Sequence, residues 1–138
     1  MARRIPEFTA RERNLVSQTL VERFGQPIPV QSIQSEIQLN LLKDELTQCP
    51  AQTWQVGVCH FVVFKTGDSR FRCQFYYTDA EQFGTSQMEY DNLGDCVIDL
   101  LQVQGKHEDE RKRVMRGLNA VDFSKANDGE DNFAPLIV

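Results

Sequence analysis

The chain has 138 residues, about the length of one globular domain. Hydrophobic residues make up 41% of it and charged residues 25%, an ordinary balance that indicates neither a disordered chain nor a membrane span. The net charge of −5 excludes a strongly cationic protein that coats a polyanion.

The cysteine pattern and the apolar runs predict a cytoplasmic protein without a membrane segment. Cys49, Cys59, Cys73 and Cys96 lie 10, 14 and 23 positions apart, without the close pairs of a zinc or thioredoxin-type motif. Arg3 and Arg4 precede no apolar run, so they do not begin a signal peptide. We expect reduced thiols, no metal and no cofactor.

The first predicted element is a helix over residues 9–24. Thr9 and Glu12 have the spacing of a capping box, in which each side chain accepts a hydrogen bond from the other residue's backbone N–H. Gly25 follows where a left-handed helix end is common, and Pro27 prevents continuation. Apolar residues between them recur at helical spacing: Leu15, Val16, Leu20 and Phe24.

Strands are predicted next. From Ile33 to Leu41 apolar and polar residues alternate, as in a strand with one wet face. Residues 54–65 and 70–78 are rich in aromatic and β-branched residues and read as a hairpin, with Gly67-Asp68 at the centre of a type II′ turn. Residues 85–90 are predicted as a fourth short strand.

This turn predicts pairs whose residue numbers add up to 135, and hence two faces. The core face would hold Val58, His60, Val62, Phe64, Phe71, Cys73, Phe75 and Tyr77. The other, mixed face would hold Cys59, Phe61, Val63, Lys65, Arg70, Arg72, Gln74 and Tyr76. We expect the C-terminal helices, or the second copy of a homodimer, to cover the mixed face.

Helices are predicted after Asp91 or Asn92, either of which can act as the N-cap. The apolar positions favour two alternatives equally: one helix over 92–118 that continues through Gly105, or two short helices that break there. We therefore expect an α+β fold in one domain, residues 1–119. An N-terminal helix packs on a meander of three or four antiparallel strands, and residues 120–138 form a flexible acidic tail with an apolar end.

Charge segregation is the most unusual feature of the sequence. Residues 73–105 contain no Lys or Arg and six acidic residues, and the remaining 105 residues sum to +1, from 15 basic and 14 acidic residues. Such a region attracts a basic partner. The candidate binding residues are Asp79, Glu81, Glu89, Asp91, Asp95 and Asp99.

Catalytic chemistry has one weak candidate. His60 and Cys73 fall diagonally on the predicted core face, where a thiol and its base could meet in a pocket between the sheet and the C-terminal helices. A weak candidate for a surface that stacks nucleic-acid bases combines two basic and two aromatic side chains on the predicted mixed face: Arg70, Arg72, Phe61 and Tyr76. The usual phosphate-binding, hydrolase and metalloprotease motifs are missing from the sequence.

These patterns favour a non-enzymatic protein that binds another protein through an acidic surface, as adaptors, secretion chaperones and neutralising proteins do. The competing hypothesis is an enzyme or small-ligand-binding domain that uses His60 and Cys73 or the acidic cluster. Nucleic-acid binding is the third and least favoured hypothesis.

Overall fold

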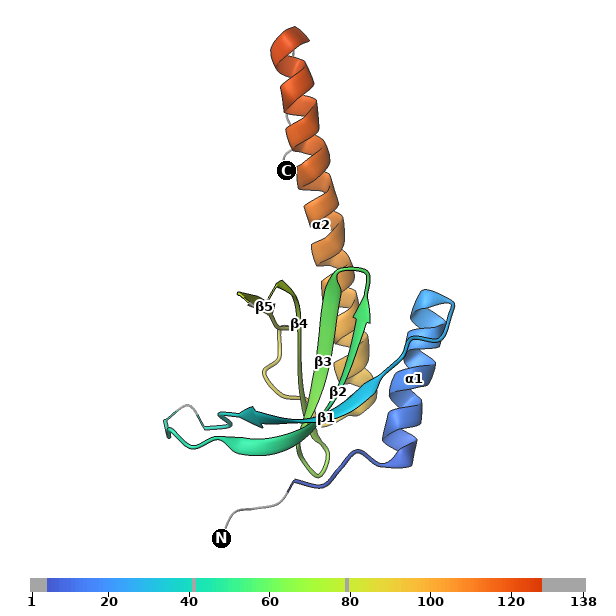
Figure 1. The fold of residues 1–138 in the computed structure, drawn as a ribbon, viewed down its shortest axis with the longest axis vertical. Coiled ribbons are helices and arrows are strands. Elements are labelled where there is room, and N and C mark those ends of the chain that lie inside the picture. The colour runs from blue at the N-terminus through green and yellow to red at the C-terminus, as the bar shows by residue number, and fades with distance from the viewer. Residues whose placement is uncertain (1–4, 41, 79, 128–138) are drawn as a thin grey trace. The chain divides into compact units, whose positions relative to one another are not determined.

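A computed structural model gives the fold of the chain and describes residues 5–40, 42–78 and 80–127, with the side chains of the last helix described as far as Val114. A helix, five strands and a second helix follow one another along the chain (Figure 1). Two compact units are distinguished, one that ends at Leu101 and one that begins at Gln102. The predicted α+β class is confirmed.

Helix α1 (Ala10–Phe24) begins and ends where the sequence predicts. The backbone N–H of Glu12 donates to Thr9 Oγ1 over 3.1 Å, and the backbone N–H of Thr9 donates to Glu12 Oε1 over 2.8 Å, which completes the capping box. At the other end Gly25 has a φ of 74° and its N–H donates to the Val21 carbonyl. Val16 and Leu20 are buried.

The sheet has five antiparallel strands in chain order rather than three or four. They are β1 (Gln31–Ile37), β2 (Thr47–Val56), β3 (Cys59–Gly67), β4 (Arg70–Thr78) and β5 (Glu81–Phe83). The prediction of one strand over 54–65 is wrong, because Gly57, with a φ of 61°, turns the chain between β2 and β3. The strand predicted over 85–90 is also wrong. Only Tyr90 of that segment joins the sheet, as an isolated bridge to Phe71.

The register of the β3–β4 hairpin differs from the predicted one by a single residue. Gly67 pairs with Arg70, so the turn consists of Asp68 and Ser69. A bulge at Thr66 lies between this pair and the next one, Lys65 with Phe71. Beyond the bulge the paired residue numbers add up to 136, as in Val63 with Cys73. Because side chains alternate along a strand, this one-residue shift places the predicted core-face residues of β3 and those of β4 on opposite faces of the sheet.

We call the two faces of the sheet the helix-covered face and the second face. On β3 and β4, the helix-covered face holds Phe61, Val63, Lys65, Phe71, Cys73 and Phe75, and the second face holds His60, Val62, Phe64, Arg72, Gln74 and Tyr76. The predicted mixed face is therefore divided between the two.

Both helices contact the helix-covered face. From the α1 side, Lys65 Nζ lies 2.8 Å from Glu12 Oε1, and the ring of Phe8 lies 6.1 Å from that of Phe71. From the side of helix α2 (Leu93–Asn127), Cys73 Sγ lies 3.8 Å from the carbonyl oxygen of Cys96. The core lies in this layer, and its buried residues include Val16, Leu20, Phe61, Val63, Phe75, Val97 and Leu100.

The second face is curved. Figure 1 shows β1 and the start of β2 running across the direction of β3 and β4. This bend brings the Leu39 carbonyl within 3.3 Å of Arg72 Nη2 on β4. Cys49, Ala51 and Val62 lie on this face and are buried.

Helix α2 (Leu93–Asn127) is a single helix, so the continuous alternative is the correct one. Asn92 is the cap, since its Oδ1 accepts from the backbone N–H of Asp95 over 3.0 Å. Residues 120–127, which we expected to begin a flexible tail, are helical, and the rest of that predicted tail lies outside the described residues. Across the parts of the chain that the structure describes, no helix combines the length and apolar character needed to cross a bilayer.

Candidate functional site

Glu89 is the most strongly paired of the predicted acidic residues. Its carboxylate accepts from Thr66 Oγ1 over 2.8 Å and forms ion pairs of 3.2 Å with Arg70 and with Arg72. Partial burial raises the pKa of Glu89, but the hydrogen bonds from Thr66, Arg72 and Arg70 outweigh it and bring the pKa below its ordinary value. Glu89 therefore belongs to a bracing network and adds no unopposed charge.

Asp99 also has a partner inside the molecule. Tyr90 is buried and donates its hydroxyl to Asp99 Oδ2 over 2.8 Å, and the same hydroxyl contacts Thr85 Oγ1. Burial and the Asp99 carboxylate raise the pKa of Tyr90 to about 12. This contact fixes the segment before α2 against the helix itself.

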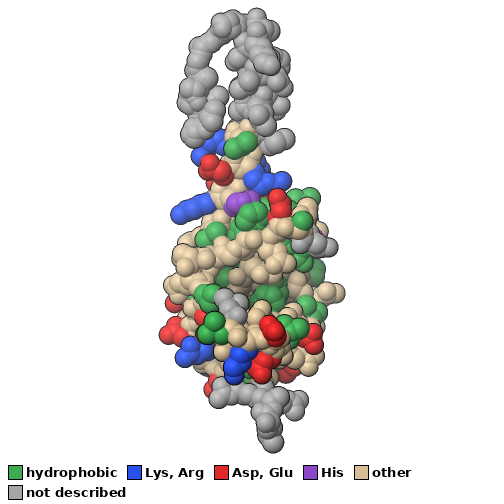
Figure 2. Space-filling view, turned by 90° about the vertical axis from the view of Figure 1, so that its left-hand side faces the viewer, with side chains coloured by type: hydrophobic (Ala, Val, Ile, Leu, Met, Phe, Trp, Pro, Cys, Tyr) green, Lys and Arg blue, Asp and Glu red, His purple; other side chains and the backbone are tan. Residues whose placement is uncertain are grey.

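The remaining acidic residues do not form one surface. Tyr90 bridges Phe71 at one end of β4, and Glu81 pairs with Thr78 at the other. Phe71 and Thr78 are seven positions apart, roughly 23 Å of strand, so Glu81 lies far from Asp91. Asp79 lies outside the described residues. Figure 2 shows acidic and basic side chains next to one another near the lower end of the face it presents.

Asp91 and Asp95 are the acidic pair that stays exposed at one place. They flank the N-cap Asn92 at the start of α2, and Asp95 lies in the first turn of the helix. Ile98, 47% exposed, follows Asp95 by one helical turn. What remains of the predicted acidic surface is thus Asp91 just before the cap, and Asp95 with an exposed apolar side chain one turn further along α2.

The structure does not bring His60 and Cys73 together. The shift in register places His60 on the second face, where its ring stacks on that of Tyr76 with centroids 4.9 Å apart. Cys73 lies on the helix-covered face, with its Sγ 3.9 Å from Thr85 Oγ1. No thiol–imidazole pair forms between these two residues, because the sheet separates their side chains.

The predicted stacking platform is not assembled either. Phe61 is 1% exposed on the helix-covered face, whereas Tyr76 lies on the second face. The two arginines, Arg70 and Arg72, contact Glu89.

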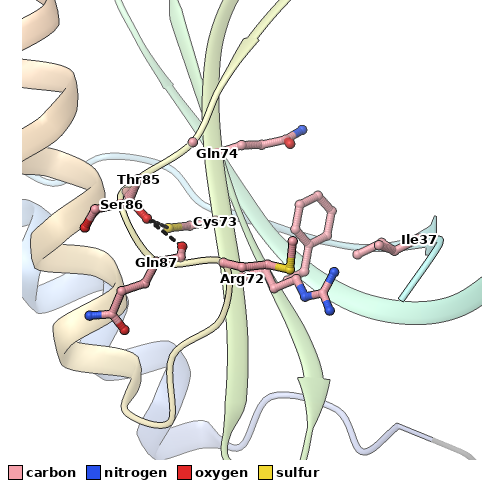
Figure 3. A pocket seen from close by; sticks show the side chains of 10 residues that line it. Ile37, Arg72, Cys73, Gln74, Thr85, Ser86 and Gln87 are labelled. Atoms are coloured by element: carbon pink, nitrogen blue, oxygen red, sulfur yellow. Dashed lines mark hydrogen bonds between the residues drawn. The ribbon is translucent and has the colours of Figure 1, made fainter. Parts of the chain in front are cut away.

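A pocket of about 430 Å³ lies beside β4. It is lined by Ile37, Phe64, Arg72, Cys73, Gln74, Gly84, Thr85, Ser86, Gln87 and Met88. In Figure 3 the side chains of Arg72 and Gln74 point to one side of β4 with Ile37, and Cys73 points to the other side, toward Thr85. The pocket thus differs from the expected one, because a loop rather than a C-terminal helix lines it and His60 takes no part.

The polar groups of this pocket are already held in place. Arg72 is fixed by Glu89 and by the Leu39 carbonyl, and Thr85 Oγ1 donates to the Gln87 carbonyl over 3.1 Å. Within the described ranges, no three His, Cys, Asp or Glu side chains come together as a metal site.

Two thiols meet behind the pocket. Cys96 is fully buried on α2 and contacts Cys73, which is only half-buried. A hydrogen bond from the Cys96 thiol lowers the pKa of Cys73 despite the opposing effect of burial, and it raises that of Cys96 together with burial. The sequence predicts Cys73 on the core face of the sheet, but which thiol touches it depends on how α2 docks on β4.

No protein-family model, no curated protein and no solved structure matches this chain. We therefore infer its function from its own contacts, charges and pocket.

Proposed function

We propose that this chain is a small, non-enzymatic, cytoplasmic protein that acts by binding a basic protein partner at the start of α2. The exposure of Asp91, Asp95 and Ile98 around the start of α2 is the observation that supports it. Two exposed carboxylates and an exposed apolar side chain at one helix start combine long-range attraction of a cationic surface with apolar area to bury on contact.

Part of this arrangement also has a local role. A carboxylate in the first turn of a helix interacts favourably with the helix dipole, so Asp95 contributes a few tenths of a kcal/mol, about 0.3–1, to the stability of α2. That role requires neither the exposure of Ile98 nor a second carboxylate before the cap. The combination of all three is what favours a binding surface.

The test compares variants of the tagged chain in capture from a lysate of its native cells, at low and high salt. Asp91→Asn with Asp95→Asn should remove the partner, and Ile98→Ser should weaken its capture. Screening predicts that salt also weakens capture by the unaltered chain. Asp99 is left intact because it accepts from Tyr90.

The matched control is Glu22→Gln with Glu36→Gln, which removes two charges at exposed positions on α1 and β1. This control should capture the partner as well as the unaltered chain does. Circular dichroism verifies that each variant is folded. Equal capture by the Asp91/Asp95 variant and the unaltered chain would reject the proposal.

A second candidate function is small-ligand binding in the pocket beside β4. Its volume of about 430 Å³ is typical of ligand sites, and its lining combines apolar Phe64 and Met88 with polar Arg72 and Gln74. A fragment screen by thermal shift tests it. Hits that raise the melting temperature of the unaltered chain but not of Gln74→Trp, which fills the pocket, would support ligand binding.

Homodimerisation also stays a proposal, now for the second face, where Ile33 is 42% exposed on β1. Sedimentation equilibrium over a range of concentrations measures it directly. A dimer should be weakened by Ile33→Lys, which places a charge on that face without touching the helices.

A further inference from the structure

Cys73 and Cys96 are held face to face by two different elements. Cys73 lies in the middle of β4, paired with Val63, and its side chain points at α2. Its Sγ is 3.8 Å from the Cys96 carbonyl oxygen and 3.9 Å from Thr85 Oγ1. Cys96 lies near the start of α2 and is fully buried.

The two cysteines differ in exposure. Cys73 lines the pocket beside β4 and is half-buried, so it is the cysteine that a small solute in the pocket would meet first. Cys96 is 0% exposed and lies behind Cys73. This is the arrangement of a first-reacting thiol and a second thiol that resolves the product.

We propose that Cys73 and Cys96 are a redox-reactive thiol pair that hydrogen peroxide converts into a disulfide. In the first step the Cys73 thiolate attacks one peroxide oxygen, the O–O bond breaks, and Cys73 becomes a sulfenic acid while hydroxide leaves and takes up a proton as water. In the second step the Cys96 sulfur attacks the Cys73 sulfur, the S–O bond breaks, and a second water leaves with the proton from Cys96. The two sulfurs lose two electrons in total, and the peroxide gains them.

The electrostatics agree with this order of events. The thiolate is the reactive form of cysteine, and the hydrogen bond from Cys96 lowers the pKa of Cys73. The same contact and burial raise the pKa of Cys96, so Cys73 is the thiol of the pair that ionises first. Asp99 opposes the ionisation of Cys73, and Thr85 assists it.

The other two cysteines serve as internal controls. Cys49 pairs with Ser35 on the second face, and Cys59 pairs with Val56 on the helix-covered face. Cys49 and Val56 are seven positions apart on β2, and the side chains of Cys49 and Cys59 lie on opposite faces of the sheet, so these thiols cannot form a disulfide with each other. Both are buried.

The chain permits a simple experiment. Because residues 73–105 contain no Lys or Arg, trypsin releases one peptide, 73–106, that contains both Cys73 and Cys96. A second tryptic peptide, 44–65, contains both Cys49 and Cys59. The folded protein is treated with hydrogen peroxide, denatured, alkylated, digested and weighed by mass spectrometry.

We expect peptide 73–106 to become lighter by two hydrogen atoms and to take up no alkylating group, and peptide 44–65 to be alkylated twice. Dithiothreitol should restore both alkylation sites in 73–106. Alkylation of both cysteines in 73–106 after peroxide treatment would overturn the proposal. Conversion of Cys73 to a sulfinic acid while Cys96 is still alkylated would also overturn it.

Variants locate the first step. In the Cys96→Ser variant, the sulfenic acid of Cys73 has no resolving thiol and should be trapped by dimedone. In the Cys73→Ser variant, Cys96 should stay reduced. Cys49→Ser is the matched control and should form the disulfide at the unaltered rate. Dimedone labelling of Cys96 in Cys73→Ser would show that the burial argument is wrong. The measurement on the unaltered chain decides the proposal even if a variant fails to fold.

Discussion

Lys65 Nζ and Glu12 Oε1 lie 2.8 Å apart in the layer between α1 and the sheet, where the lysine is only 2% exposed. The ammonium group also donates to the Glu7 carbonyl over 3.1 Å and lies 5.9 Å from the centre of the Phe8 ring. Glu12 therefore has two roles, since the same oxygen accepts the backbone N–H of Thr9 in the capping box. A buried charge of this kind is tolerated only when it is paired and hydrogen-bonded.

Glu12→Gln separates these two roles. Glutamine can replace glutamate in a capping box, so the variant keeps the helix start and removes only the charge opposite Lys65. We expect a loss of about 3 kcal/mol in the free energy of unfolding, because an uncompensated ammonium is left buried. Urea denaturation measures this loss.

The control for charge on α1 is Glu22→Gln, at an exposed position, which should change stability by less than about 0.5 kcal/mol. Adding Lys65→Met to Glu12→Gln should recover most of the loss, since the buried charge is then gone as well. If the double variant is as unstable as Glu12→Gln, the loss does not arise from the ion pair.

Glu89→Gln should make stability less dependent on pH. The pKa of Glu89 is lowered in the folded state, so its carboxylate stabilises the fold above the unfolded-state value of roughly 4.3 and loses this effect as the pH falls through the folded-state value. At pH 7 we expect the variant to be about 1–2 kcal/mol less stable, since hydrogen bonds to a charged group are lost. Below a pH of about 4 the difference should shrink.

Denaturation at a series of pH values checks this prediction. Asp91→Asn is the control, because it removes one exposed acidic side chain of the neighbouring segment outside the arginine network. A constant difference between Glu89→Gln and the unaltered chain from neutral to acid pH would contradict the assigned role of the carboxylate.

Tyr90→Phe should remove one step from the ionisation of the three tyrosines. Burial and Asp99 raise the pKa of Tyr90 to about 12, so its phenol ionises late in an alkaline titration followed by absorbance. A raised pKa stabilises the fold fully below the unfolded value of about 10, and this effect is lost as the pH rises toward 12. Tyr76→Phe should leave the late step in place, and its persistence in Tyr90→Phe would assign it to another residue.

Ser69→Gly should stabilise the β3–β4 turn. Ser69 has a φ of 141°, a backbone conformation that glycine adopts readily and side chains disfavour. We expect a gain of about 1 kcal/mol and a melting temperature higher by about 4 °C, measured by calorimetry. Asp68→Gly, at the neighbouring position without a positive φ, should lower stability instead, and a gain there of the same size would refute the explanation.

Local sequence patterns predict the helix starts well because each depends on residues a few positions apart. The capping box of Thr9 and Glu12 and the cap at Asn92 need no tertiary information, and both are present. The α+β class follows from the same local periodicities.

The register between β3 and β4 could not be predicted from local sequence patterns. Gly67 indicated a turn one residue earlier than the actual one, and the bulge at Thr66 has no pattern of its own in the sequence. That single residue moved Lys65 from the predicted mixed face into the core and separated His60 from Cys73. Burial of a lysine depends on a partner 53 positions away in the chain, Glu12.

The acidic region shows the same limit. A window that starts at Cys73 excludes Arg70 and Arg72 by a few positions, yet the fold places both against Glu89. Charge counted along the chain therefore overstated the unopposed charge in space. Asp91 and Asp95, which follow the last bridge to the sheet, are the part of the prediction that forms no ion pair with Arg70 or Arg72, since both arginines pair with Glu89.

The one-residue bulge at Thr66 also has a consequence for changes in chain length. Lys65 pairs with Phe71, and five residues lie between them. Because side chains alternate along a strand, an even change in this number keeps the same residues of β3 and β4 on the helix-covered face, whereas an odd change does not. Inserting two residues into this turn should preserve the buried set, whereas inserting one should bring the second-face residues of one strand to the core side. Natural or engineered variants of this turn should accordingly differ in length by even numbers.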